Sequence, residues 1–126
     1  IVNELDEEEH RAMREGLDEE TLALYDILRK EGLAKDDIAK VKQISKELLN
    51  KLKAEKLRFD SWHVKEATRD AVRIEIKNYL WDDILGLPTS YSEIEVHDKS
   101  EAAYTHIYQQ YAFLYQAPSK PYSQHI

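Results

Sequence analysis

The fold of this chain is decided by the stretch FDSWHVKEATRDAVRIEIKNYLWDDILGLP, which spans residues 59–88. Asp60 and Ser61, near its start, are residue types that cap helix N-termini, and the Gly-Leu-Pro sequence at its end is typical of a helix stop. The residues between these signals follow a helical pattern. We therefore expect a long helix at about 61–85, with roughly seven turns.

Apolar residues cover much of the circumference of this predicted helix. One stripe consists of Ala67, Ala71, Ile74, Trp81 and Leu85, and a second set consists of Val64, Val72, Ile76, Tyr79 and Leu80. A helix with so wide an apolar arc is usually surrounded by other helices. The sequence therefore predicts an all-α fold, a compact bundle of about five helices around this long central helix.

The remaining helices are predicted from their caps and their apolar spacing. We expect them at about 3–14, from Asp18 to about Gly32, at about 36–56, and from Asp98 to about Tyr115, where Asp98 and Glu101 resemble a capping box. Residues 89–97 are expected to form an irregular connection. Residues 1–115 then make a single helical domain and residues 116–126 a flexible C-terminal tail. Because the first residue is Ile1, we expect a fragment of a larger subunit.

Composition excludes several classes of protein. The chain has no cysteine, so it has neither a disulfide framework nor a thiolate metal site. Residues 1–31 hold eleven acids and four bases and carry the whole net charge of −7, whereas residues 35–58 hold eight bases and four acids and can face that acidic segment. A general nucleic-acid binder would be basic overall. No apolar run is long enough to span a membrane and no signal peptide is visible, so we expect a cytoplasmic protein.

No catalytic or metal-binding motif is visible in the sequence. A glycine-rich phosphate loop, paired histidines at metal spacing and a nucleophile elbow are all missing. The five histidines occur singly, which is typical of surface or packing positions. We therefore predict no catalytic residue, no metal site and no cofactor in this domain.

Two rows of side chains are the candidates for binding a partner. Arg69, Arg73 and Lys77 recur every four residues on one helix face, either as a solvated face paired with neighbouring acids or as a docking stripe for an acidic partner or a phosphate backbone. The second row lies on the last predicted helix and consists of Tyr104, Tyr108, Tyr111 and Tyr115. Its rings either pack on a neighbouring helix or anchor a partner. Spacing alone leaves both alternatives open.

Two blocks of sequence resemble the C-terminal helical domain of the restriction subunit of type I restriction-modification enzymes. The first block is GLDEE at residues 16–20 followed by ALYD at residues 23–26. The second block contains Trp62, Glu66, Arg69, Arg73, Ile76, Lys77 and Leu80 and leads to Gly86 and Pro88. The order and spacing of the blocks agree with that family, so the resemblance covers residues 5–115.

The resemblance implies a function in the parent enzyme and not in this domain alone. The parent subunit would be an ATP-dependent DNA translocase and endonuclease that uses ATP and magnesium in upstream domains. The domain would help to dock that subunit onto the methyltransferase core, which consists of modification and specificity subunits. The alternative is a DNA-contacting module, in which Arg69, Arg73, Lys77 and the lysines of residues 36–56 touch phosphates.

Overall fold

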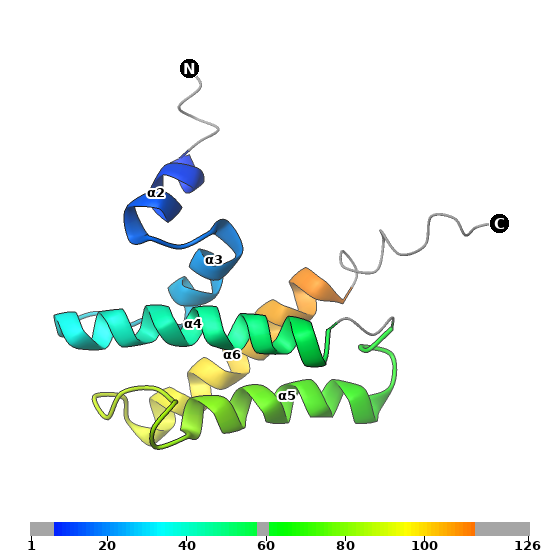
Figure 1. Ribbon diagram of the computed structural model, residues 1–126. Helices are drawn as coiled ribbons and strands as arrows, with labels where there is room; N and C mark the ends of the chain where they lie inside the picture. Colours follow the sequence, from blue (N-terminus) through cyan, green and yellow to red (C-terminus); the bar gives the residue numbers. More distant parts are fainter. Residues whose placement is uncertain (1–6, 58–60, 113–126) are drawn as a thin grey trace.

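The computed structural model describes residues 7–57 and 61–112, and this part of the chain is helical without strands (Figure 1). Its five helices are α2 (Glu7–Glu15), α3 (Glu19–Leu28), α4 (Lys35–Glu55), α5 (Glu66–Trp81) and α6 (Glu93–Tyr111). The predicted all-α bundle of about five helices is therefore confirmed. The predicted flexible tail at 116–126 lies outside the described residues, as do the predicted cap Asp60 and the last member of the tyrosine row, Tyr115.

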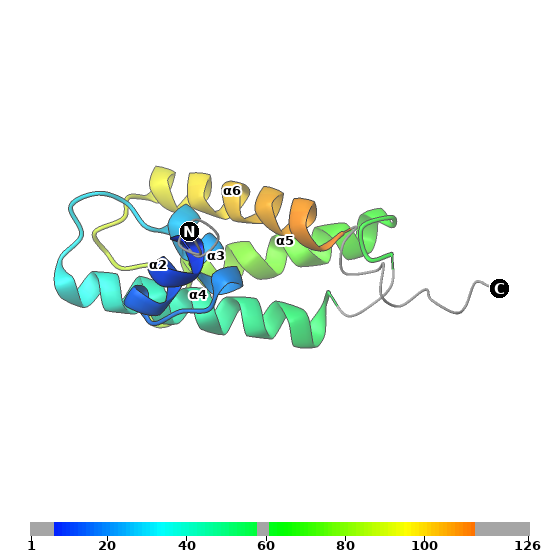
Figure 2. The same cartoon turned by 90° about the horizontal axis from the view of Figure 1, so that it is seen from above.

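Four of the helices close a ring around the core. α3 packs against α4 and α6, and α5 also packs against α4 and α6, so each of these helices has two neighbours (Figures 1 and 2). α2 packs on α3 alone and lies on the far side of α4 from α5 (Figure 1). The centre of the ring is filled by aliphatic side chains with no exposed surface: Leu28, Val41, Leu48, Leu52, Ile76 and Ile107.

α4 forms where the sequence predicts it, whereas α3 begins where predicted but ends at Leu28, before the expected stop at Gly32. Asp18 is the N-cap of α3, and its carboxylate accepts a hydrogen bond from the amide of Thr21 at 2.7 Å. α4 begins and ends within one residue of its predicted bounds, because its apolar side chains recur regularly every three or four residues.

The basic face of α4 meets the acidic N-terminal helices, as predicted. Lys42 pairs with Glu15 of α2 at 2.9 Å, and Lys53 pairs with Glu20 of α3. These lysines are the main cause of the lowered pKa of each glutamate.

α5 is shorter than the predicted helix at 61–85, and its start differs. Ser61 does not cap a helix but lies in a turn with a φ of 59°. Trp62 is buried, and the Thr68 hydroxyl donates a hydrogen bond to its backbone carbonyl. Arg69 likewise donates to two carbonyls of this turn, at 3.0 and 3.2 Å. The carbonyls are thus satisfied by side chains of α5, so the turn needs no helical hydrogen bonds of its own.

The end of α5 also differs from the prediction. The Asp82 carboxylate accepts hydrogen bonds from the amides of Ile84 and Leu85, both at 2.8 Å, and this bends the chain into a turn directly after Trp81. Gly86 does not have the left-handed conformation expected for a helix C-cap. It is required for another reason: a Cβ atom at this position would lie 2.4 Å from the backbone oxygen of Leu80.

The apolar arc predicted to be surrounded by other helices is buried on one side of α5 only. Ile74, Trp81 and Leu85 are 53%, 38% and 52% exposed. The second apolar set supplies the buried residues, which are Val72, Ile76 and Leu80. Both stripes fit helical periodicity, and only the positions of α4 and α6 decide between them.

α6 begins earlier than predicted. The predicted capping box of Asp98 and Glu101 lies inside the helix, and the irregular connection predicted at 89–97 contains its first turn. The actual capping box consists of Ser92 and Glu95: the Ser92 hydroxyl accepts from the amide of Glu95, and the Glu95 carboxylate accepts from the amide of Ser92. Two boxes of the same spacing compete in this stretch, and Lys30, from the connection between α3 and α4, binds the Glu95 carboxylate of the box that forms.

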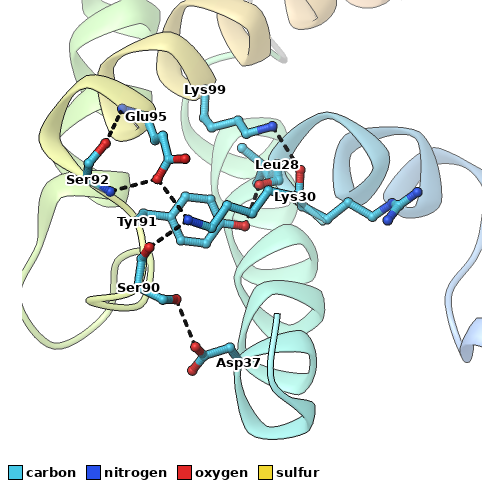
Figure 3. Close-up of polar contacts among 9 residues, drawn as sticks. Leu28, Lys30, Asp37, Ser90, Tyr91, Ser92, Glu95 and Lys99 are labelled. Atoms are coloured by element: carbon cyan, nitrogen blue, oxygen red, sulfur yellow. Dashed lines mark hydrogen bonds and ion pairs between the residues drawn. The ribbon is translucent and has the colours of Figure 1, made fainter. Parts of the chain in front are cut away.

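A network of polar contacts ties the connection between α5 and α6 to the end of α3 (Figure 3). The Tyr91 hydroxyl donates to the backbone carbonyl of Leu28 at 2.7 Å, and Lys30 binds the Glu95 carboxylate at 2.8 Å. The Lys99 ammonium donates to the carbonyl of Arg29 at 2.8 Å. The Tyr91 and Lys99 donors satisfy carbonyls at the end of α3 that have no partner within the helix.

Candidate partner-binding groove

An open groove of about 590 Å³ lies between α5 and α6. It is lined from α5 by Glu66, Arg69, Asp70 and Arg73, and from α6 by Tyr104, Thr105, Tyr108 and Gln109. The two helices are antiparallel (Figure 1), so the first half of α5 lies beside the second half of α6. This arrangement brings four of the predicted partner-binding residues together in one groove, two arginines and two tyrosines.

Both arginines of the groove have partners within the domain. Arg69 donates to the backbone carbonyls of His63 and Val64, as described above. Arg73 forms an ion pair with Glu101 at 3.3 Å, and its guanidinium lies 4.5 Å from the centre of the Tyr104 ring. Their charges are thus partly compensated before any ligand binds.

The acids near the arginines do not pair as expected. Glu66 and Asp70 were predicted to neutralise the arginine row, but within residues 7–57 and 61–112 neither carboxylate forms an ion pair, and Glu101 of α6 takes this role for Arg73. Lys77, the last member of the row, lies one turn beyond the groove and is exposed. The groove therefore presents two carboxylates together with two arginines.

The tyrosine row divides between two surfaces of α6. Tyr104 is buried against α5, and burial raises the pKa of its hydroxyl. Tyr108 is half-buried and lies edge-on to the Trp62 ring, with 6.0 Å between ring centres. Tyr111 lies away from the groove, where its hydroxyl donates to the Glu20 carboxylate of α3 at 2.9 Å. Tyr104 and Tyr108 therefore belong to the groove, and Tyr111 belongs to the contact between α3 and α6.

Three residues near the groove were not predicted as part of a site. Thr105 and Gln109 are exposed polar residues of α6 with no periodic signal, and they are found only once α5 and α6 are paired. Trp62 is 2% exposed, and its ring packs edge-on against the Tyr108 ring. Its indole N–H has no hydrogen-bond acceptor among the described residues. Its place in the second block of the family resemblance was the sequence signal for it.

Three of the six lysines at residues 36–56, which are the candidates for phosphate contact, are in ion pairs. Lys42 and Lys53 bind the glutamates named above, and Lys51 pairs with Glu75 of α5 at 3.3 Å. These three lysines therefore serve contacts within the domain.

Two further features of the described part of the chain concern metal ions and membranes. Within it, no three histidine, aspartate or glutamate side chains are grouped so that they could hold a metal ion. None of its helices is both long and apolar enough to cross a membrane.

Comparison with known proteins gives one match. The family model described as "Type I restriction enzyme HindI endonuclease subunit-like, C-terminal" matches residues 1–116. No curated protein and no solved structure matches the chain. The match covers both sequence blocks quoted above and all five helices. This chain therefore belongs to the family of C-terminal domains of type I restriction enzyme HindI endonuclease subunit-like proteins.

Proposed function

We propose that this domain has no active site of its own and docks the restriction subunit onto the methyltransferase core, which is formed by modification and specificity subunits. DNA translocation and cleavage, with their requirement for ATP and magnesium, would then belong to upstream domains of the same subunit. The complete enzyme would act on DNA in the cytoplasm.

The observation that carries this proposal is the mixed chemistry of the groove between α5 and α6. Two tyrosines, two arginines and two carboxylates line one open surface. Tyrosine and arginine are enriched among residues that dominate binding between proteins. A groove that presents both carboxylates and guanidinium groups suits a polypeptide segment, which carries acidic and basic groups, better than it suits a uniformly anionic DNA backbone.

The alternative function, direct contact with DNA phosphates, depends on cations that are free to bind. Four of the candidate cations already form an ion pair within the domain: Arg73, Lys42, Lys51 and Lys53. Phosphate binding would have to break these pairs and would also bring a polyanion close to Glu66 and Asp70. The docking role is therefore the better supported of the two.

An arginine introduced at Thr105 separates the two functions by the sign of its effect. Thr105 is exposed and lines the groove, so Thr105→Arg adds bulk and positive charge there without disturbing the core. In the full restriction subunit, we expect this change to weaken binding to the purified methyltransferase core by about tenfold or more. A phosphate contact would instead be strengthened by the added charge.

The matched control is Ala102→Arg, which introduces the same side chain at an exposed position of α6 that does not line the groove. It should change binding less than about twofold, since energetically neutral surface positions dominate outside a binding site. Titration of labelled methyltransferase core with each full-length variant measures these affinities, and titration of plain DNA at two salt concentrations measures the alternative. Unchanged assembly together with tighter, salt-sensitive DNA binding by Thr105→Arg would overturn the docking proposal.

A further inference from the structure

The end of α5 and the turn after it expose an unusual amount of apolar surface. We define the corner patch as Ile74, Trp81, Ile84 and Leu85. Trp81, Ile84 and Leu85 are 38%, 80% and 52% exposed and lie within five consecutive residues, and Ile74 lies two turns before Trp81 on the same side of the helix. Elsewhere in the described chain, large exposed apolar residues occur singly, which is normal for a protein surface. A grouped set indicates an interaction surface.

Hydrogen bonds within the turn after α5 fix the position of the corner patch. The Asp82 carboxylate binds the amides of Ile84 and Leu85, and the amide of Gly86 donates to the backbone oxygen of Asp82 at 2.9 Å. The amide of Leu87 donates to the oxygen of Leu80 at 3.0 Å. The apolar side chains are therefore presented to solvent by an ordered turn, because four hydrogen bonds fix the chain around them.

An acidic hollow adjoins the patch. It has a volume of about 140 Å³ and lies between the end of α5 and the start of α6. Trp81 forms part of its wall, and Asp82, Asp83 and Glu93 contribute three carboxylates. No lysine, arginine or histidine lines it, and in the described part of the chain neither Asp83 nor Glu93 forms an ion pair.

We propose that the corner patch and its acidic hollow bind a helix of a separate subunit, one that carries apolar side chains next to a lysine or arginine. A long basic side chain can lay its methylene stem along Trp81 while its charged head reaches the carboxylates of the hollow. The apolar side chains of that helix then cover Ile84 and Leu85. Such a helix matches both the apolar side chains of the corner patch and the negative charge of the hollow.

The position of the corner patch favours a separate subunit as the source of this helix, because both ends of the described chain, at α2 and at the end of α6, lie away from the end of α5 (Figure 1). Chain preceding Glu7 joins the domain at α2, which lies on the far side of α4 from α5 (Figure 1). The patch also lies on the same helix pair as the groove, at the opposite end of α5. Because α5 spans 16 residues, the two surfaces are separated by about 20 Å, a distance that one partner interface covers. The inference thus rests on the proposed docking function and adds a second contact to it.

The test uses two matched pairs of variants of the full restriction subunit. Asp83→Lys reverses one charge of the hollow, and its control Asp98→Lys makes the same change at an exposed position of α6 that lines neither surface. Ile84→Ser removes one side chain of the patch, and its control Met13→Ser removes a similarly exposed apolar side chain on α2, 73% against 80%. We expect Asp83→Lys and Ile84→Ser each to weaken binding to the methyltransferase core by about tenfold, and each control by less than about twofold.

The outcomes distinguish this inference from the proposed function. If Thr105→Arg weakens assembly while Asp83→Lys and Ile84→Ser do not, the inference is overturned and the groove proposal stands. If none of the three weakens assembly, both are overturned. Tighter assembly of Asp83→Lys would show an acidic partner and overturn the stated chemistry. Patch variants that change the proteolysis pattern of the free subunit, and leave assembly unchanged, would show that another part of the same chain covers the patch and would overturn the choice of a separate subunit.

Discussion

Replacing Tyr91 with phenylalanine should destabilise the whole bundle, because its buried hydroxyl is one of the contacts that join the connection between α5 and α6 to the end of α3. The change removes one oxygen atom and leaves the ring in place. In the native protein that hydroxyl donates to the carbonyl of Leu28 at 2.7 Å, and both residues are buried. Burial raises the pKa of Tyr91 to about 12, so the hydroxyl keeps its proton throughout the neutral range.

The expected loss is about 1–2 kcal/mol in the free energy of unfolding. A hydrogen bond contributes about 0.5–1.5 kcal/mol net, and a buried carbonyl left without a donor costs about 1–3 kcal/mol. The Leu28 carbonyl lies at the end of α3, where no amide of the same helix can replace the lost donor. With a urea m-value of about 2 kcal/mol per molar, the midpoint of unfolding should fall by about 0.5–1 M and m should stay constant.

Tyr79→Phe is the control for this measurement. It removes the same atom, but the Tyr79 hydroxyl binds the Glu47 carboxylate at 2.9 Å in an exposed position, where water can replace it. We expect a loss below about 0.5 kcal/mol. Urea unfolding followed by circular dichroism compares the two variants directly. Equal losses, within about 0.3 kcal/mol, would refute the assignment of a structural role to the buried bond.

Two further predictions concern the turn after α5 and the acid stability of the fold. Gly86→Ala should lower the free energy of unfolding by about 1–3 kcal/mol, because the new Cβ would lie 2.4 Å from the oxygen of Leu80 and 2.5 Å from that of Asp82; an unchanged melting temperature would contradict this. The pKa of Glu20 is lowered from 4.5, mainly by the hydrogen bond from Lys53, so its contribution to stability is present above pH 4.5 and is lost as pH falls through the lower, folded pKa. Lys53→Met should therefore make unfolding less dependent on pH between about 5 and 3, and parallel curves for the two proteins would count against the pair.

The parts of the fold that were predicted correctly are those with one strong local signal. α4 has a single regular apolar stripe, so its bounds are predicted within one residue. Asp18 caps α3 through its own side chain, and that signal does not depend on the rest of the fold. Charge also gave a correct prediction, since the basic segment of α4 meets the acids of α2 and α3.

The parts that were predicted wrongly are those where two local signals compete. On α5, two apolar stripes fit the helical period, and the positions of α4 and α6 bury Val72, Ile76 and Leu80 and leave Ile74 and Trp81 outside. Before α6, two capping boxes share one spacing. Local propensity cannot rank such alternatives, because tertiary contacts decide between them.

The candidate groove was predicted in part. The arginine and tyrosine rows were each visible from spacing, but their meeting depends on the antiparallel pairing of α5 and α6, for which the sequence carries no direct signal. Tyr111 shows the limit of this reasoning: it fits the tyrosine row, yet its hydroxyl binds Glu20 on another helix. The exposed corner patch was not predicted, because Ile74, Trp81 and Leu85 were counted in the arc expected to be surrounded by helices and Ile84 was not singled out.

The closed ring of helices has a consequence for how this domain is made. α6 closes the ring by contacting both α3 and α5, and it comes last in the chain among the four helices of the ring. During synthesis, the earlier helices therefore keep one apolar side exposed to solvent until residues 93–111 have left the ribosome. Folding then depends on contacts between residues far apart in sequence, which slows the search for the native state. A chain terminated before α6 would present open hydrophobic surface to chaperones and proteases, so truncated subunits would be removed before they could compete for assembly.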